Sequence, residues 1–331
     1  MNILSIETSC DETAAAVVRD GYEPLSDVIA SSCDAFVKYG GVVPEIASRK
    51  HLEYISDVCS QAVSDAGVTF WDIDAVAVTN GPGLVGALLV GVSAAKALAY
   101  ALKKPLIAVH HIKAHICANY IEEPELKPPF VGLVASGGHS HIIYARDYVD
   151  FEILAKTRDD AAGEAFDKIA RVLSLGYPGG PLLEALAKDG NDQAYKFPRV
   201  KFSDYDFSFS GVKTAVINEI HKAKQSGAEI NRADVAASFQ RAVVDVLVNN
   251  TVSLAIEKKV EYVVMAGGVA CNKTLYNAFF EQTQRHSLKL ICPKPRLCTD
   301  NAVMVGCCAY FLAQKQEFAD MTLNAFATMP L

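Results

Sequence analysis

The feature that most constrains the fold is a pattern that occurs three times: an apolar strand that runs into a turn of small polar residues or glycine. The three occurrences are Ile3–Ile6 before Glu7-Thr8-Ser9, Val131–Val134 before Ser136-Gly137-Gly138-His139, and Tyr262–Met265 before Gly267-Gly268. Turns of this kind at strand ends leave backbone N–H groups free to face a phosphate. Three of them in one chain predict a cleft between two lobes that binds a phosphate or a nucleotide.

The segments that follow these turns indicate the fold class. The first two strands continue into further β-rich runs, Thr13–Val18 and His141–Tyr144, which predicts two hairpins. The third continues into a helical pattern at Asn272–Phe280. Strands interspersed with helices predict an α/β protein with mixed sheets.

Length and composition predict two domains of ordinary size. The chain has 331 residues, of which 51% are hydrophobic, and at this length a single core usually stops growing. The Pro-rich stretch 122–129 (EEPELKPP) is the best candidate for a linker. We therefore expect a first lobe at residues 1–128, a second lobe at 129–299, and a terminal segment, 300–331, that returns to pack on the first lobe.

Charge and cysteine content restrict the partners and the compartment. The formal net charge is −7, so the chain is not expected to bind nucleic acid alone, because phosphate contacts need clustered basic side chains. Two local basic clusters are candidate exceptions, and ordinary solvated surface explains them equally well: Lys196, Arg199 and Lys201, and Lys289, Lys294 and Arg296. The nine cysteines form no CxxC pair, and the start MNILSIETSCDE has no basic or apolar targeting region. These features favour a reducing cytoplasm over a secreted disulfide framework.

One segment, Gly83–Leu102, is apolar enough to resemble a membrane span. A charged residue inside it, Lys96, and its Gly-Pro-Gly entry favour a buried helix of a soluble protein instead. Its small residues recur every four positions, and so do those of a second helix that begins near Asn301. Because such stripes allow close approach, we expect these two helices to pack on each other between the lobes.

Two histidines give the sharpest chemical signal. His111 and His115 are four residues apart, so on a helix they project from one face and can share a divalent ion. Histidines at this spacing also serve as caps or hydrogen-bond donors, so both interpretations remain open. Ile112 follows His111 where a zinc protease has glutamate, which excludes that activity. Asp300 is a candidate third ligand, and the alternative is that Thr299 or Asp300 caps the following helix.

Other motifs have structural as well as functional interpretations. In GEAFDKIAR, the pairs Glu164–Lys168 and Asp167–Arg171 are explained by a solvated charged face. The turn GYPGGP contains Gly180, which would let a ligand come close, although a plain turn is the default interpretation. The segment SGVKT lacks the adjacent Gly-Lys and the upstream glycine of a P-loop, so we exclude a P-loop.

Taken together, these motifs resemble the TsaD family, whose members transfer a threonylcarbamoyl group to tRNA and were once described as glycoproteases. In chain order, the motifs are SIETSCDET, HHIKAH, ASGGHSH, GEAFDKIAR, GYPGGP, FSFSGVKT, AGGVACN and CTDNA. The similarity runs from the first residues past position 300 and looks closest to the bacterial branch. It implies the fold of actin, hexokinase and the seventy-kilodalton chaperones (ASKHA fold): two lobes of duplicated ribonuclease-H-like topology around a nucleotide cleft.

The resemblance also implies a site. The metal ligands would be His111, His115 and Asp300, and the ion iron or zinc, with Fe²⁺ favoured. The substrate-binding residues would be Val134, Ala135, Ser136, Gly137, Gly138, Asp167, Gly180, Glu184 and Asn272. The backbone N–H groups of Ser136, Gly137 and Gly138 would hold phosphate, and Asp167 would bind ribose hydroxyls. Separately from the resemblance, the position of SCDE after the first strand, at the predicted cleft, makes Asp11, with Glu12 second, the candidate proton acceptor; the alternative is that these acidic residues only form the turn.

The implied reaction takes the threonylcarbamoyl group from threonylcarbamoyl-AMP to the exocyclic amine of the adenosine at position thirty-seven of tRNAs that read codons beginning with A. The implied partners are TsaB and TsaE, with TsaC supplying the adenylate, and no membrane is involved. We expect a partner to supply basic surface for tRNA. Two alternatives stay open: a small-molecule phosphotransferase of the same fold, and a non-enzymatic actin-like binding module.

Overall fold

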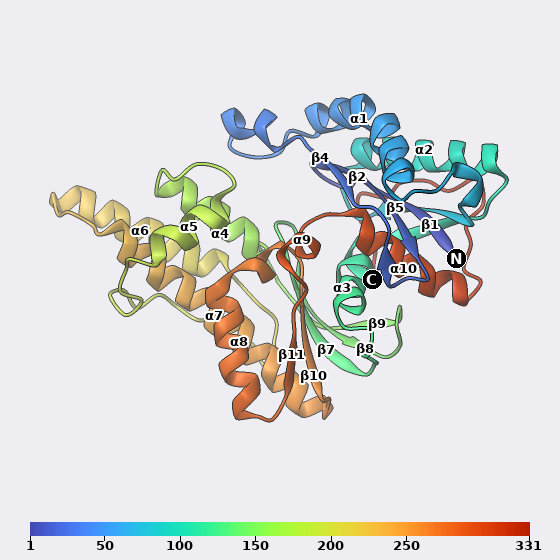
Figure 1. Cartoon of the computed structure of the whole chain (residues 1–331). Coiled ribbons are helices and arrows are strands. Elements are labelled where there is room, and N and C mark those ends of the chain that lie inside the picture. Colours follow the sequence, from blue (N-terminus) through green and yellow to red (C-terminus); the bar gives the residue numbers. More distant parts are fainter. The chain divides into compact units, whose positions relative to one another are not determined.

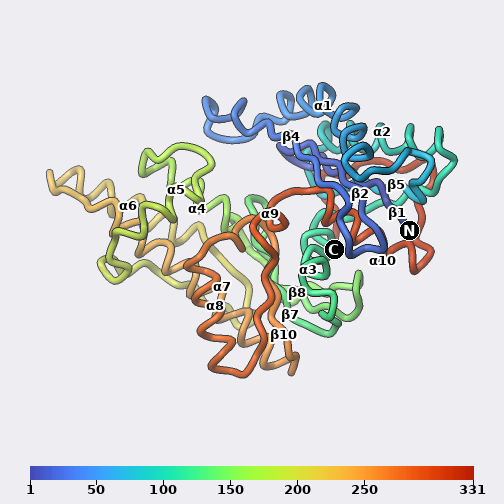
Figure 2. The backbone as a smooth tube through the Cα atoms, in the orientation of Figure 1, coloured from blue at the N-terminus to red at the C-terminus, as the bar shows by residue number.

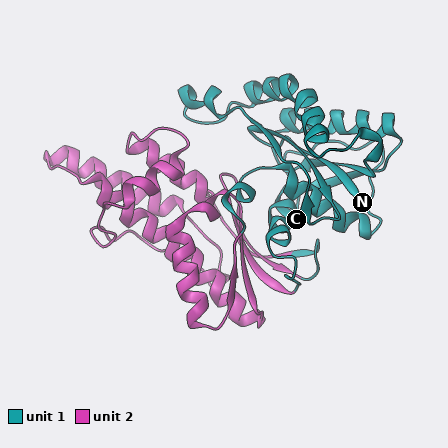
Figure 3. Ribbon diagram, in the orientation of Figure 1, with its two compact units in different colours: residues 1–128, 146–151, 293–331 teal, residues 129–145, 152–292 magenta.

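The computed structural model describes all 331 residues and divides the chain into two compact units (Figure 3). Unit 1 comprises residues 1–128, 146–151 and 293–331, and unit 2 comprises residues 129–145 and 152–292. The first crossing lies in the Pro-rich stretch. The chain returns to unit 1 at residue 293 instead of 300, through the short helix α9 (Pro295–Cys298) that precedes the last helix (Figure 2).

Unit 1 is built on a six-stranded sheet in which β1 is central. The strands are β1 (Asn2–Glu7), β2 (Glu12–Arg19), β3 (Glu23–Pro24), β4 (Val28–Ser31), β5 (Ala75–Gly81) and β6 (Leu106–His110). The order is β3-β2-β1-β5-β6, and β4 also pairs with β2. β1 and β2 form the predicted antiparallel hairpin, whereas β5 and β6 join in parallel. The helices are α1 (Pro44–Asp65), α2 (Val85–Leu102), α3 (His111–Glu122), α9 and α10 (Ala302–Gln314).

Unit 2 repeats this topology. Its strands are β7 (Phe130–Ala135), β8 (Ser140–Ala145), β9 (Phe151–Lys156), β10 (Tyr262–Ala266) and β11 (Lys289–Ile291), in the order β9-β8-β7-β10-β11. β7 and β8 form the second predicted hairpin, and β10 and β11 follow in parallel. The two sheets therefore share one strand order and one pattern of directions, which confirms the predicted duplicated α/β fold.

The helices of unit 2 include the one that the sequence predicts after the third strand and its turn. They are α4 (Ala162–Val172), α5 (Gly179–Ala187), α6 (Ser210–Ser226), α7 (Arg232–Lys258) and α8 (Lys273–Arg285). The long helix α7 packs on β7 and β10, and α5 and α8 pack on α7 (Figure 1). α8 begins directly after Asn272, whose side chain caps it, so the third predicted strand–turn–helix segment is confirmed.

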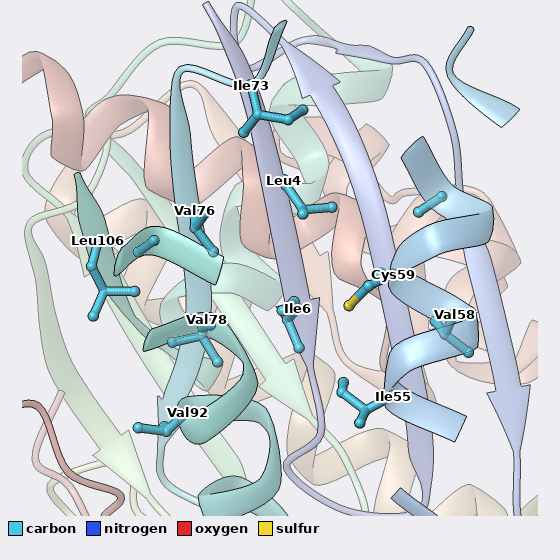
Figure 4. Close-up of a cluster of buried hydrophobic side chains, with 14 of the residues drawn as sticks. Leu4, Ile6, Ile55, Val58, Cys59, Ile73, Val76, Val78, Val92 and Leu106 are labelled. Carbon is cyan, nitrogen blue, oxygen red and sulfur yellow. The ribbon is translucent and has the colours of Figure 1, made fainter. Parts of the chain in front are cut away.

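The core of unit 1 lies on one face of its sheet. Leu4 and Ile6 of β1 point to the same side because side chains alternate along a strand, and there they meet α1 and α2. Figure 4 shows these side chains with Val76 and Val78 of β5 and Val92 of α2. All five are at most 2% exposed. This packing holds β1 rigidly, so the loop that follows Glu7 starts from a fixed point.

The opposite face of the same sheet is covered by α10. Ser5, between Leu4 and Ile6, donates a hydrogen bond from Oγ to the carbonyl of Ala302 (2.7 Å). Gly306 lies so close to β2 that a Cβ there would be 2.5 Å from a side-chain carbon of Val18. α10 also packs along α3. The second small-residue stripe thus allows a helix to approach a sheet.

The expected packing of the two small-residue helices on each other is wrong. α2 packs on α1 and β5, and α10 packs on the other side of the sheet (Figure 1). In α2, Gly91 approaches Thr8 of the loop after β1, and Gly86 approaches Ser48 of α1. A stripe of small residues permits close approach but does not specify the partner, and here a sheet separates the two helices.

α2 is long and apolar enough to cross a membrane, by length and composition only. Its inner side is buried against α1 and the sheet through Ala87, Leu88, Gly91, Val92, Ala95 and Ala99. This is the packing expected of a core helix, which is how the sequence was interpreted. All nine cysteines are free thiols, as the absence of a disulfide framework predicts.

Candidate functional site

His111, His115 and Asp300 meet at one point in unit 1. His111 opens α3, and His115 lies one turn further along the same face. The two Nε2 atoms are 3.2 Å apart, and Asp300 Oδ1 lies 3.1 Å from His115 Nε2 and 3.6 Å from His111 Nε2. One nitrogen or oxygen from each of the three thus lies within 4.8 Å of the others. Two imidazoles and a carboxylate are a donor set that suits zinc or iron.

Local structure explains why these side chains converge. α3 starts directly after β6, and His110 caps it by accepting a hydrogen bond from the backbone N–H of Ile112 (3.1 Å). α10 is capped by Asn301, whose Oδ1 accepts from the N–H of Met304 (2.8 Å). The alternative in which Thr299 or Asp300 caps that helix is therefore wrong. The Asp300 carboxylate is left to face the histidines.

The electrostatics of this cluster depend on a residue that sequence reasoning missed, Glu7. Burial alone would raise the pKa of Glu7, but the charge and hydrogen bond of His111 outweigh it and lower that pKa. Burial would likewise lower the pKa of His111, but the carboxylates of Asp300 and Glu7 raise it to about 9. The signal for Glu7 is its position as a charged residue directly after the apolar run of β1, at the start of the turn.

The candidate proton acceptors lie in the same unit, Asp11 in the loop between β1 and β2 and Glu12 at the start of β2. The pKa of Asp11 is raised by burial and by the charge of Asp300. Burial raises the pKa of Glu12 to about 7, against the opposing hydrogen bond from Ser31 Oγ to Glu12 Oε1 (2.9 Å). The other carboxylate oxygen of Glu12 is buried and accepts no hydrogen bond. A carboxyl group with such a pKa can exchange a proton near neutral pH.

Unit 2 contains a separate pocket of about 170 Å³ that brings together five of the predicted substrate residues. These five are Gly137, Asp167, Gly180, Glu184 and Asn272. The pocket is also lined by residues that were not predicted: Gly163, Phe166, Pro178, Pro181, Gly268, Val269 and Cys271. The structure explains why residue 163 is glycine: a Cβ there would lie 2.5 Å from the Ser136 carbonyl oxygen. Only glycine therefore lets α4 begin against this loop.

The remaining predicted residues do not line this pocket. Val134 and Ala135 are buried within β7, at most 1% exposed, and Ser136 and Gly138 belong to the turn beside Gly137. The N–H of Ser136 donates to the His139 carbonyl (2.8 Å), so it is not available for phosphate, and that expectation is wrong for this group. The N–H groups of Gly137 and Gly138 are not used inside the turn.

Several polar groups of the pocket are already engaged by the protein. Oδ1 of Asp167 accepts from the N–H groups of Gly179 (2.8 Å) and Gly180 (3.3 Å), which fixes the GYPGGP turn. Burial raises the pKa of Asp167, and these two hydrogen bonds oppose the shift. Asn272 caps α8 through Oδ1 and donates from Nδ2 to Gln240 (2.8 Å). Asp167 therefore has one oxygen left for a ligand, whereas Asn272 shapes the wall.

Comparison with known proteins gives consistent matches. The profile of the family TsaD, tRNA N6-adenosine threonylcarbamoyltransferase, matches residues 23–307. A protein of that name from Clostridium botulinum (strain 657 / Type Ba4) is 55% identical over 333 residues, which covers 100% of this chain and 98% of the relative. One from Clostridium perfringens (strain ATCC 13124) is 56% identical over 325 residues, covering 98% and 96%. The crystal structure of T. kodakarensis HypF is similar in fold alone: TM-score 0.64, 17% identity, 97% of this chain and 49% of that one.

Proposed function

Because the chain belongs to the TsaD family of tRNA N6-adenosine threonylcarbamoyltransferases, we propose that it transfers the threonylcarbamoyl group from threonylcarbamoyl-AMP to a tRNA adenosine. The acceptor is the exocyclic amine of the adenosine at position thirty-seven of tRNAs that read codons beginning with A. The observation that carries this proposal is the convergence of His111, His115 and Asp300, which come from sequence positions far apart.

The reaction needs a site that holds its reactants rigidly. The exocyclic amine of adenosine is a poor nucleophile, since its lone pair is delocalised into the purine ring. Orientation of bound reactants can supply ~7–11 kcal/mol of the barrier. A buried, close-packed support such as the β1 core of unit 1 is suited to that role.

In this proposal, His111, His115 and Asp300 hold one divalent ion, iron or zinc, with Fe²⁺ favoured. The fit is supported by the chemistry of the three donors and by their burial: His111 and His115 are 7% and 1% exposed. When bound, such an ion supplies a Lewis acid that can polarise the carbamoyl carbonyl. The three side chains bind and orient the threonylcarbamoyl end of the donor.

In this proposal, the pocket of unit 2 is a nucleotide site. The N–H groups of Gly137 and Gly138 face the phosphate, and the second carboxylate oxygen of Asp167 accepts from a ribose hydroxyl. Gly180, where a Cβ would meet nothing within 4 Å, leaves room for the ligand. Glu184, which accepts from the N–H of Lys273 (2.8 Å), and Asn272 form the opposite wall, and Val134 and Ala135 support the turn from within β7.

The proton from the attacking amine passes to a carboxylate near the ion. Asp11 and Glu12 are the candidates, and Glu12 has the better-matched pKa, about 7, with one oxygen that accepts no hydrogen bond. A base whose pKa lies near the working pH combines the right protonation state with sufficient basicity. Replacement of Glu12 by Gln is expected to lower kcat far more than it raises KM.

Binding of tRNA is proposed to require partner proteins in the cytoplasm. The chain is acidic, and three of the six basic residues singled out in its sequence form ion pairs: Arg199 with Asp245, Lys289 with Glu261, and Lys294 with Glu122. Support for a protein partner comes from the outer surface of α1 and α2, which exposes Leu52 and Leu89 at a hollow of about 490 Å³. TsaB and TsaE are the proposed partners, and TsaC supplies the adenylate.

The test is reconstitution with the purified chain, threonylcarbamoyl-AMP, tRNA and the partner proteins, with modified adenosine measured by mass spectrometry. His111→Ala is expected to abolish product and metal binding, whereas His286→Ala, at an exposed histidine, is expected to change neither. Phosphate transfer from ATP to a small acceptor without tRNA would favour a phosphotransferase instead. Nucleotide-dependent filaments or client binding without turnover would favour an actin-like module.

A further inference from the structure

Glu7 is a fully buried carboxylate at the end of the central strand of unit 1. Its exposed fraction is 0%, and the other buried residues of β1 are apolar except for Ser5. Burial of an ionised carboxylate is costly unless hydrogen bonds compensate it. The partners of Glu7 should therefore explain why the chain places it there.

Those partners come from three separate elements. Oε1 accepts from the backbone N–H of Ser9 (2.6 Å) in the following loop. Oε2 accepts from Oγ1 of Thr79 on β5 (2.7 Å) and lies 3.1 Å from Nδ1 of His111 at the start of α3. The N–H of Ser9 and the hydroxyl of Thr79 thus fix the carboxylate of Glu7. The fixed carboxylate faces Nδ1 of His111, one of the proposed ion ligands.

The contact determines which nitrogen of His111 can bind an ion. An ionised carboxylate only accepts hydrogen bonds, so it selects the form of the ring in which Nδ1 carries the proton. Nε2 then presents its lone pair, and it is Nε2 that lies beside His115 and Asp300. In metal sites, a carboxylate on the far nitrogen of a histidine fixes the ring orientation and raises its basicity.

We infer that Glu7 is a positioning residue that holds the His111 ring with Nδ1 protonated and Nε2 aimed at the divalent ion. The inference rests on the ion site of the proposed function. His115 offers a contrast inside the same cluster, because its Nδ1 is buried and has no hydrogen-bond partner. Only His111 therefore has a carboxylate on its Nδ1, the nitrogen that faces away from His115 and Asp300.

A merely structural role would make Glu7 important for stability alone, so the test separates stability from the ring's protonation. Glu7→Gln keeps the size of the side chain and an oxygen for Ser9, but it can turn an amide N–H toward His111. Nδ1 would then have to accept, and the proton would move to Nε2, where it blocks ligation. Thr79→Val is the matched control, because it removes a donor to Glu7 without touching His111.

The experiment titrates metal-free full-length protein with Zn²⁺ against a chromophoric chelator and records thermal unfolding of each metal-free variant. We expect Glu7→Gln to weaken Zn²⁺ binding about 10- to 100-fold, with a smaller loss for Thr79→Val. Equal Zn²⁺ affinity of Glu7→Gln and wild type would overturn the inference. If His111→Ala also binds Zn²⁺ like wild type, the ion site itself is wrong, so the two failures are distinguishable.

A second measurement needs no substitution. Nitrogen-15 NMR of the Zn²⁺-loaded wild type reports which ring nitrogen of each histidine binds the ion. We expect His111 to bind through Nε2 and to retain a slowly exchanging proton on Nδ1. Coordination through Nδ1 would contradict the role of Glu7, even if Glu7→Gln fails to fold.

Discussion

Replacement of Asn301 tests how the chain frees Asp300 for the proposed ion. Asn301 is fully buried and makes two kinds of contact at the start of α10. Its Oδ1 accepts from the N–H of Met304 (2.8 Å), and its Nδ2 donates to the carbonyl of Thr299 (2.7 Å). Asn301→Ala removes both, so it should loosen the helix start and the loop that carries Asp300.

The expected loss of stability at the start of α10 follows from these contacts. Loss of an N-cap side chain costs about 1 kcal/mol, and loss of the part-buried hydrogen bond to the carbonyl of Thr299 costs about 1–2 kcal/mol more. The total, about 2–3 kcal/mol, is a large share of the ~5–15 kcal/mol that stabilises a typical domain. Since each 1.4 kcal/mol is a tenfold change, local opening of the α10 start should rise about 30- to 150-fold.

Hydrogen exchange measured by mass spectrometry on peptides that cover residues 299–306 gives this opening directly. Asn301→Asp keeps the acceptor for Met304 and should recover about 1 kcal/mol of the loss. Asp300→Asn is the matched control, and it should leave exchange in α10 close to that of wild type. The reasoning fails if Asp300→Asn speeds exchange as much as Asn301→Ala does, because Asp300 would then be the cap.

Three further predictions concern separate parts of the chain. Burial raises the pKa of Glu12 in the folded state to about 7 from its ordinary value of 4.5, so the wild type loses stability as the pH rises between these values. In urea unfolding of metal-free protein, the stability advantage of Glu12→Gln over the wild type should grow through that window and then level off, and a constant difference would refute the prediction. Gly306→Ala would place a Cβ 2.5 Å from a β2 side chain and should lower the free energy of unfolding, measured by thermal unfolding, by about 1–3 kcal/mol. The control Gly211→Ala in α6, with its nearest neighbour at 3.9 Å, should be neutral or stabilising. Equal effects of the two substitutions would contradict the close packing of α10 on β2. Asp167→Ala removes the acceptor that fixes the N–H of Gly180 and the oxygen proposed for a ribose hydroxyl. It should weaken AMP binding, measured by calorimetry, at least tenfold, and unchanged affinity would exclude Asp167 from the nucleotide site.

Much of the fold could be predicted because its signals are local. Apolar runs that end in turns of small polar residues or glycine identified β1, β7 and β10, and the β-rich runs that follow the first two turns identified the two hairpins. The partners of helices could not be predicted in this way. Gly91 and Gly306 lie in equally small stripes, yet one faces the loop after β1 and the other faces β2, because the sheet order decides which surface each helix meets.

The candidate site likewise contains features that the sequence predicts and features that depend on the tertiary fold. The i, i+4 spacing of His111 and His115 is a helical property, so their common face follows from sequence. The role of Glu7 does not, since its hydrogen bonds to Thr79 and His111 join residues 72 and 104 positions apart. Capping of α10 by Asn301 instead of its two neighbours depends on the path of one short loop, which composition does not specify.

The most direct test of the account is the ion itself. Elemental analysis and Zn²⁺ or Fe²⁺ titration of the freshly purified chain should show about one tightly bound divalent ion per molecule. Separate replacement of His111, His115 and Asp300 by Ala should each remove it, while His286→Ala keeps it. Retention of the bound ion by all three variants would contradict the central claim that these side chains form the metal centre.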